Sequence, residues 1–170
     1  HSENGGWDWD LTTGFNGPDG NYLYGSTILP SETNLGRVIV GGSGYSSPPV
    51  FISENHGESF ESMSDGIPNT MVFALAGTLD DNLVFAATEV GPYIWQSATQ
   101  EWEDLTGLGA PDQTYWSVEY LNDFNTARFG TYGRGIWDFV VTSYSNVMAG
   151  DVNGDLNVNI QDIILTINFV

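Results

Sequence analysis

The sequence predicts an all-β protein made of about three repeated units, each a meander of four antiparallel strands, and three observations support this. Short runs of β-branched and aromatic residues are bounded by Gly, Pro, Asn and Asp. An apolar pattern of helical period occurs only at the end of the chain. The strand-like runs recur in one order with a period of roughly 42 to 50 residues, which is typical of β-propeller blades.

The strands are expected in the following order. First strands are predicted at 22–27, 72–78 and 116–121, second strands at 38–41, 83–87 and 127–130, and third strands at 50–53, 93–96 and 135–138. Fourth strands are predicted at 59–63 and 102–105, whereas residues 139–143 continue the third strand of the last unit. A β-sandwich with unequal loops is the alternative fold.

Three blades cannot close a ring, so further blades are expected either from additional sequence of a longer protein or from other chains. We expect a piece of a longer protein, because neither end resembles a natural terminus. The predicted domains are a partial propeller at 1–146 and a calcium-binding segment at 147–170.

The charge of the chain restricts its function. Its 170 residues include 22 acidic side chains, three basic ones (Arg37, Arg128 and Arg134) and no cysteine, for a net charge of −19. Such a chain cannot neutralise a phosphate backbone or an anionic membrane, and it forms neither disulfides nor thiolate metal sites. No apolar run is long enough for a membrane helix. The acidic, lysine-free composition favours a secreted, extracellular protein in calcium-rich surroundings.

A polar turn is expected between the third and fourth strands of the first unit, in the segment SENHGESF at 53–60. The Asn55 side chain can close this turn on backbone amides, Gly57 can adopt a left-handed conformation, and the aromatic ring of Phe60 can pack between blades. The structural residues of the turn are Ser53, Asn55, Gly57, Ser59 and Phe60.

This segment resembles the Asp-box (BNR) repeat, Ser-x-Asp-x-Gly-x-Thr-Trp. The stretches FGTYGRGIWDF at 129–139 and NGGWDWD at 4–10 resemble parts of secreted bacterial BNR or sortilin-like β-propellers. The resemblance implies a propeller of six to ten blades, in which the box is a folding element distant from catalysis.

The segment DVNGDLNVNIQD at 151–162 fits a twelve-residue EF-hand loop. Oxygen ligands for Ca²⁺ fall on alternate positions of the loop and at its end: Asp151, Asn153, Asp155, Asn157, Asn159 and Asp162. A helix is expected to follow from Gln161, because apolar residues then recur at helical spacing. The alternative is a solvated polar turn before a short helix.

The same segment resembles one half of a type I dockerin repeat, including aspartate at the last ligand position. Leu156 stands where glycine is usual, and only one of the two repeats of a dockerin is present in 151–170. Ile160 and Gln161 occupy the positions at which cellulosomal dockerins often carry the hydroxyl residues that meet cohesin, which argues against cohesin binding.

No catalytic residue is predicted. Seven acids could serve a glycosidase, but their spacing selects no pair: Asp8, Asp10, Glu89, Glu101, Glu103, Asp104 and Glu119. Arg134, in a glycine-flanked turn with Tyr132, is a candidate for holding a sugar or anionic ligand, or it ties acidic loops together. The six tryptophans form either inter-blade core or a platform that stacks on carbohydrate.

The sequence therefore predicts a non-catalytic extracellular module, a calcium-stabilised propeller segment used in adhesion, scaffolding or self-assembly. Its expected partners are itself, as a multimer or filament, another extracellular protein, or carbohydrate. The competing hypothesis is part of a propeller-type glycoside hydrolase with a dockerin-like appendage.

Overall fold

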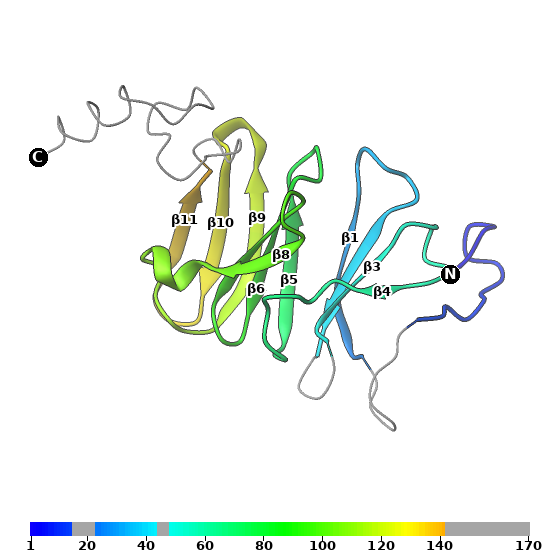
Figure 1. Ribbon diagram of the computed structural model, residues 1–170, viewed down its shortest axis with the longest axis horizontal. Coiled ribbons are helices and arrows are strands. Elements are labelled where there is room, and N and C mark those ends of the chain that lie inside the picture. The colour runs from blue at the N-terminus through cyan, green and yellow to red at the C-terminus, as the bar shows by residue number, and fades with distance from the viewer. Residues whose placement is uncertain (15–22, 44–47, 142–170) are drawn as a thin grey trace, which may run out of the picture. The chain divides into compact units, whose positions relative to one another are not determined.

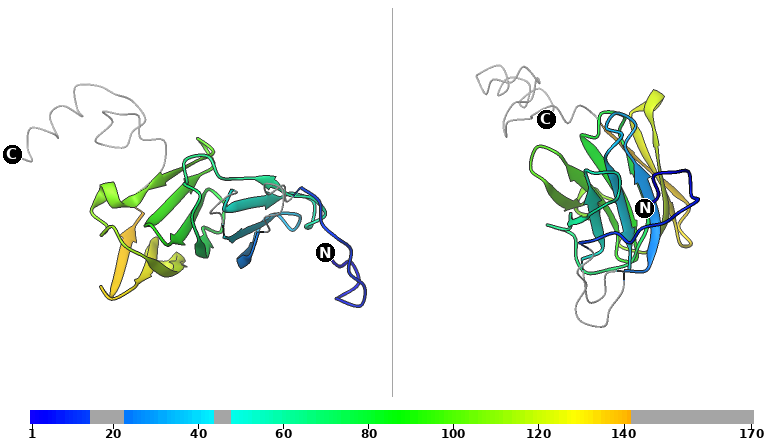
Figure 2. Two further views of the ribbon diagram at one scale, coloured as in Figure 1. Left: turned by 90° about the horizontal axis from the view of Figure 1, so that it is seen from below. Right: turned by 90° about the vertical axis from the view of Figure 1, so that its right-hand side faces the viewer.

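The computed structural model describes residues 1–14, 23–43 and 48–141, and within these residues the chain forms three antiparallel β-sheets (Figure 1). Each sheet is a meander in which consecutive strands pair with one another. The fold is therefore all-β and composed of propeller-type blades, as the sequence predicts. Figure 2 shows the same three sheets in two further orientations.

The first blade consists of β1 (Gly25–Pro30), β2 (Val38–Gly42), β3 (Val50–Ser53) and the short β4 (Glu61–Ser62). The first strand lies three residues later than the predicted 22–27. The prediction followed the aromatic run around Tyr24, but the residue that packs against the neighbouring blade is Leu29, near the other end of the strand. The pairing with β2 shifts register between Gly25 and Thr27.

The second blade consists of β5 (Val72–Gly77), β6 (Leu83–Thr88), β7 (Pro92–Gln96) and β8 (Glu101–Asp104). A 3-10 helix, η1 (Leu105–Leu108), follows β8 and is capped by the Asp104 carboxylate, which accepts from the amide of Thr106. Every residue of β6 is buried. This strand is apolar on both faces because the second blade lies between two others.

The third blade has three strands in the described part of the chain: β9 (Tyr115–Leu121), β10 (Thr126–Thr131) and β11 (Ile136–Val140). The second 3-10 helix, η2 (Asn122–Phe124), joins β9 to β10. As predicted, Phe139 continues the third strand, which ends at Val140.

Apolar side chains fill the spaces between the blades. One cluster joins first-blade residues such as Ile39 and Val50 to second-blade residues such as Val84 and Trp102. The indole of Trp102 also donates a hydrogen bond of 2.7 Å to the carbonyl of Met63. Between the second and third blades, the fully buried ring of Phe85 meets three aromatic rings, those of Tyr120, Phe129 and Phe139, at centroid distances of 5.7, 6.3 and 6.2 Å.

The polar turn between β3 and β4 is closed by the side chains of Ser53 and Asn55. The Asn55 carbonyl oxygen accepts from the Ser59 amide at 3.0 Å, and the Ser53 hydroxyl accepts from the Gly57 amide at 2.9 Å. Gly57 has φ +83°, and Phe60 is buried in a cluster with Val40 and Phe51. The side chains of Ser53 and Asn55 thus satisfy backbone donors that the turn leaves unpaired.

The first residues of the chain form a second turn of this kind, which was not predicted from the sequence. Asn4 accepts from the Asp8 amide at 3.0 Å, and Ser2 accepts from the Gly6 amide at 2.8 Å. The side chain of Asn4 donates to Asp8 at 2.8 Å, as that of Asn55 does to Ser59 at 2.9 Å. The shared pattern Ser-Glu-Asn-x-Gly at 2–6 and 53–57 was the signal that could have revealed the copy.

The whole chain divides into two units, His1–Val140 and Val141–Val170. The predicted calcium ligands, 151–162, and the helix expected after them lie outside the described residues. Among the residues that are described, no helix is long and apolar enough to cross a membrane.

Candidate functional site

One backbone hydrogen bond recurs in all three blades and defines one end of each sheet. It joins the residue after the second strand to the residue before the first: Ser43 to Tyr24 at 3.1 Å, Glu89 to Met71 at 3.0 Å, and Tyr132 to Thr114 at 3.0 Å. The connections between second and third strands therefore lie at the same end of the blades as the starts of the first strands. The candidate residues Tyr132 and Arg134 belong to this end.

The turn that carries these two residues is tightly specified. The hydroxyl of Thr131 donates to the carbonyl of Gly135 at 2.7 Å and accepts from the amide of Arg134 at 3.0 Å. Gly133 and Gly135 have φ values of +88° and +79°, a region that favours glycine. The backbone therefore leaves the side chains of Tyr132 and Arg134 exposed to solvent.

Three aromatic rings from two blades meet beside this turn. Phe73 of β5 and Trp116 of β9 have centroids 4.3 Å apart, and Trp116 and Tyr132 follow at 6.2 Å in an edge-to-face arrangement. Trp116 is 50% exposed and Tyr132 is 72% exposed. We call Phe73, Trp116 and Tyr132 the aromatic surface. Exposed rings held by one another can stack on the apolar face of a sugar without first becoming ordered.

Tyr115 anchors the strand that carries Trp116. Its ring is fully buried, lies 5.8 Å from that of Phe129, and its hydroxyl donates to the carbonyl of Pro111 at 2.8 Å. Burial raises the pKa of Tyr115, so the phenol remains a neutral donor at physiological pH. This anchor fixes the start of β9, and with it the position of the aromatic surface.

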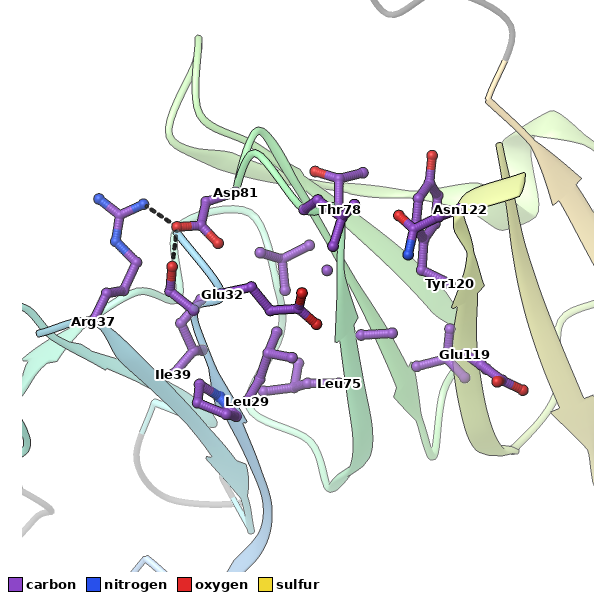
Figure 3. A pocket seen from close by; sticks show the side chains of 17 residues that line it. Leu29, Glu32, Arg37, Ile39, Leu75, Thr78, Asp81, Glu119, Tyr120 and Asn122 are labelled. Atoms are coloured by element: carbon purple, nitrogen blue, oxygen red, sulfur yellow. Dashed lines mark hydrogen bonds and ion pairs between the residues drawn. The ribbon is translucent and has the colours of Figure 1, made fainter. Parts of the chain in front are cut away.

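The opposite end of the blades holds a cavity of about 290 Å³, lined by the inner strands β1, β5 and β9 and by the loops that follow them (Figure 3). Its polar lining includes Glu32, Asp81, Glu119 and Asn122. Burial raises the pKa of Tyr120, whose side chain also lines the cavity. The Glu119 carboxylate points away from the cavity (Figure 3), so the carboxylates of Glu32 and Asp81, together with Arg37, set its acidic character.

Arg37 holds one wall of this cavity together. Its guanidinium pairs with Asp81 of the second blade at 3.2 Å and with Glu54 of the first blade at 2.9 Å. The hydroxyl of Ser31 donates to the same Asp81 carboxylate at 2.6 Å. A dashed line in Figure 3 marks the contact between Arg37 and Asp81. Arg37 and Asp81 thus link the two blades, and their charges are already used in that structural role.

The three arginines occupy separate places. Arg37 lies at the cavity, Arg128 pairs with Asp138 on β11, and Arg134 lies in the turn after β10. Within the described residues Arg134 forms no ion pair, so it does not tie acidic loops together there. An arginine triad around one substrate carboxylate is therefore not formed by these residues.

Most of the seven acids named above do not come together. Glu119 alone of them lines the acidic cavity, while Asp104 caps η1 and Asp8 accepts from Asn4 in the N-terminal turn. The cavity residues Glu32 and Asp81 were not singled out from the sequence. The spacing of these two residues in the sequence does not distinguish them from other acids, because the loops that bring them together belong to different blades.

The tryptophans divide between the two predicted roles. Trp102 is buried between blades, whereas Trp7, Trp9 and Trp116 are exposed and Trp137 is 41% exposed. Among the residues that the structure describes, only Trp116 combines exposure with packing against an exposed tyrosine. The structure therefore selects one tryptophan of the six as a surface platform residue.

One group in the described part of the chain brings together side chains that could ligate a metal ion. His1, Glu3 and Glu58 place potential ligand atoms within 4.8 Å of one another. Glu3 and Glu58 are exposed, and exposed carboxylates often gather without an ion. The predicted calcium ligands, Asp151 to Asp162, are not among the described residues.

Comparison with known proteins supports the fold. No family model and no curated protein matches the sequence. Solved structures that match include the GH74 xyloglucanase from Xanthomonas campestris, with a TM-score of 0.55 and 14% identity over 66% of this chain and 19% of that one. The GH74 enzyme from Niastella koreensis matches with a TM-score of 0.53 and 14% identity over 66% of this chain and 20% of that enzyme.

An ancestral GH74 enzyme is similar at a TM-score of 0.52 and 15% identity, over 67% of this chain and 17% of that enzyme. The chain thus spans about a fifth of the length of these structures. At this level of identity the similarity establishes the propeller-type fold alone.

Proposed function

We propose that this chain is a non-catalytic binding module of an extracellular β-propeller and that its aromatic surface binds neutral carbohydrate. The observation that carries the proposal is the pair Trp116 and Tyr132, two exposed rings in edge-to-face contact. They lie at the end of the third blade that holds the connection between β10 and β11. Arg134 adds donors next to Tyr132 that no described carboxylate engages.

The ligand class follows from charge and ring chemistry. A net charge of −19 opposes the approach of polyanions, whereas neutral sugars present apolar C–H faces and hydroxyl groups. One structural neighbour is a xyloglucanase, so xyloglucan is a reasonable first ligand to test. The corresponding role is adhesion or scaffolding on polysaccharide at the cell exterior.

Removing a ring of the aromatic surface is expected to weaken polysaccharide binding. We expect Tyr132→Ala and Trp116→Ala each to reduce affinity for xyloglucan about tenfold, since a stacked aromatic contact contributes about 1–2 kcal/mol. Affinity electrophoresis in gels containing xyloglucan, supported by calorimetry with its oligosaccharides, measures this effect.

The matched control is Trp7→Ala, because Trp7 is 88% exposed but lies on the N-terminal segment. This variant should bind like the wild type. Equal retardation of all three variants and the wild type would contradict the proposal, as would a complete lack of binding to neutral polysaccharides.

A glycoside hydrolase remains the second candidate function, because the acidic cavity has the carboxylates of Glu32 and Asp81 in its lining. Glycosidases use two carboxyl groups across the scissile bond. Release of reducing ends from xyloglucan, abolished by Glu32→Gln in a protein that still folds, would show that the chain is a hydrolase and not a non-catalytic binding module. We expect no such release.

We further propose that the segment 151–162 binds one Ca²⁺ through Asp151, Asn153, Asp155, Asn157, Asn159 and Asp162. Three carboxylates and three amide-bearing residues suit the large, flexible oxygen shell of calcium better than the octahedral shell of magnesium. As in EF-hand loops, the residue at loop position 7 would contribute its backbone carbonyl.

Calcium titration by calorimetry should therefore show one binding site per chain. The double variant Asp151→Ala/Asp155→Ala should lose it, because it removes two of the three carboxylates. Asp123→Ala, which removes an exposed acid elsewhere, should leave the binding isotherm unchanged. Millimolar calcium should also raise the melting temperature relative to chelator, and a wild-type titration without heat or thermal shift would refute the site.

A further inference from the structure

The first and second blades share a contact between an aromatic residue near the start of the fourth strand and the connection that leads into the same blade. Phe60 and Trp102 are these aromatic residues, and both are buried. The amide of Phe60 donates to the carbonyl of Thr13 at 2.8 Å, and the amide of Trp102 donates to the carbonyl of Asp65 at 2.7 Å. Each fourth strand is thus held by its backbone as well as by its ring.

A glycine follows the acceptor residue in both connections. Gly14 and Gly66 have φ +89°, and an added Cβ would overlap the carbonyl oxygen of Phe60 at the first position and that of Trp102 at the second. Glycine is needed because the backbone of the aromatic residue passes directly over it. The two blades therefore use one docking arrangement, which consists of an acceptor carbonyl, a left-handed glycine and an aromatic residue of a fourth strand.

The connection into the third blade carries the same glycine. Gly66 and Gly109 each begin a Gly-x-Pro segment at the same distance before the strands β5 and β9. Gly109 also has a left-handed backbone, with φ +101°, but an added Cβ there would meet nothing within 4 Å. In the described part of the chain the third blade has three strands, and β11 forms the edge of its sheet (Figure 1). No described residue passes over Gly109 as Trp102 passes over Gly66.

A cavity of about 160 Å³ lies beside Gly109. Leu105 and Leu108 line it from the second blade, and Phe129 and Trp137 line it from the third. Leu108 is 59% exposed and Trp137 is 41% exposed, so the cavity is open to solvent on one side. An apolar cavity of about 150 Å³ can hold a benzene ring. This cavity can therefore receive an aromatic side chain.

The register of β11 determines how a strand would pair with it. Asp138 on β11 is equivalent to Ile94 on β7, because each pairs with the third residue of a six-residue second strand. Ile94 pairs on its other side with Glu103, the residue after Trp102. A strand added to β11 in this register places the residue after its aromatic side chain opposite Asp138. The charge of Asp138 and the net charge of −19 favour a neutral or basic strand.

The residues that directly follow β11 do not provide the aromatic side chain. In the first two blades the aromatic residue stands eight positions after the third-strand residue that is equivalent to Asp138. The residue eight positions after Asp138 is Asn146, which is polar. The spacing that supplies Phe60 and Trp102 to their own blades therefore supplies no aromatic ring to the third blade.

We infer that the third blade binds an extended strand of another polypeptide along β11, with a tryptophan or phenylalanine side chain in the cavity beside Gly109. The backbone amide of that residue donates to the carbonyl of Leu108, which is equivalent to Asp65 because each precedes the left-handed glycine. In such strand addition the main chain provides affinity and the pocket provides specificity. This inference is independent of carbohydrate and calcium binding.

A pair of synthetic peptides tests the inference with the full chain. The probe is TQQWQNL, which is the sequence 99–105 of the second-blade fourth strand with its three acidic residues replaced by amides. The control peptide, TQQAQNL, has alanine in place of the tryptophan. Fluorescence anisotropy of the labelled peptides should show that the probe binds at least about tenfold more tightly, because a buried aromatic anchor dominates such an interface.

Two matched glycine variants locate the binding. Gly109→Ala should weaken binding of the probe about tenfold or more, because its Cβ would meet the incoming backbone as an added Cβ at Gly66 would meet that of Trp102. Gly133→Ala places alanine at a similar φ of +88° away from the cavity, and it should bind like the wild type. Leu108→Asp, which changes an exposed cavity residue, should also weaken binding.

Three results would each overturn the inference. They are a wild type that binds neither peptide, equal affinity of the wild type for the two peptides, and equal affinity of Gly109→Ala and Gly133→Ala for the probe.

Discussion

Replacing Phe85 by alanine is expected to lower the free energy of unfolding by about 3–5 kcal/mol, because the substitution leaves a cavity in the core between two blades. The ring is fully buried and lies within 6.3 Å of three other aromatic rings, those of Tyr120, Phe129 and Phe139. Urea denaturation followed by tryptophan fluorescence gives the change directly, as a lower midpoint at similar slope.

The matched control for this experiment is Phe124→Ala. Phe124 lies in η2 and is 73% exposed, so the same truncation there should change stability by less than about 0.5 kcal/mol. A comparable loss at both positions would show that Phe85 does not join the second and third blades in the manner described.

Gly66→Ala is expected to be similarly damaging for a different reason. Gly66 has φ +89°, and an added Cβ would overlap the backbone carbonyl oxygen of Trp102. The amide of Trp102 donates to the carbonyl of Asp65 at 2.7 Å, so the two backbones cannot separate without breaking this contact. Backbone strain and overpacking together should cost about 2–5 kcal/mol, measured by the same denaturation experiment.

Gly133→Ala separates the two contributions. Gly133 has nearly the same φ, +88°, but an added Cβ there would meet no atom within 4 Å. This variant should therefore lose only the cost of the left-handed backbone, about 1–2 kcal/mol. If Gly66→Ala cost no more than Gly133→Ala, the close approach of the first-blade connection to Trp102 would be refuted.

The strands were predictable because their signals are local. The runs at 50–53 and 93–96 match β3 and β7 closely, since short apolar segments between turn residues specify a buried strand whatever follows them. The first strand was misplaced because aromatic residues near Tyr24 resemble a strand, while the packing of Leu29 against another blade set the pairing. Long-range packing overrides local propensity in such cases.

The candidate site was predicted in part. Sequence alone singled out Tyr132 and Arg134 from their glycine-flanked turn, and the structure adds Trp116 and Phe73 as ring neighbours. The acidic cavity was not predicted as a site: Glu119 was one of seven candidate acids, but Glu32 and Asp81 were not singled out, because the lining residues come from three different blades. Carboxylates are so frequent in this chain that no spacing could distinguish these three.

The sequence by itself determined the number, order and kind of the blades, the polar turn chemistry of Asn55 and the excess of negative charge, because each depends on neighbouring residues or on composition. Only the tertiary structure decided which face of each blade packs against another blade. Arg128 and Phe85 occupy equivalent positions on β10 and β6, yet one pairs with Asp138 in solvent and the other is buried among rings. That difference arises from strand register and from which faces are covered, and both are set by contacts between residues far apart in the chain.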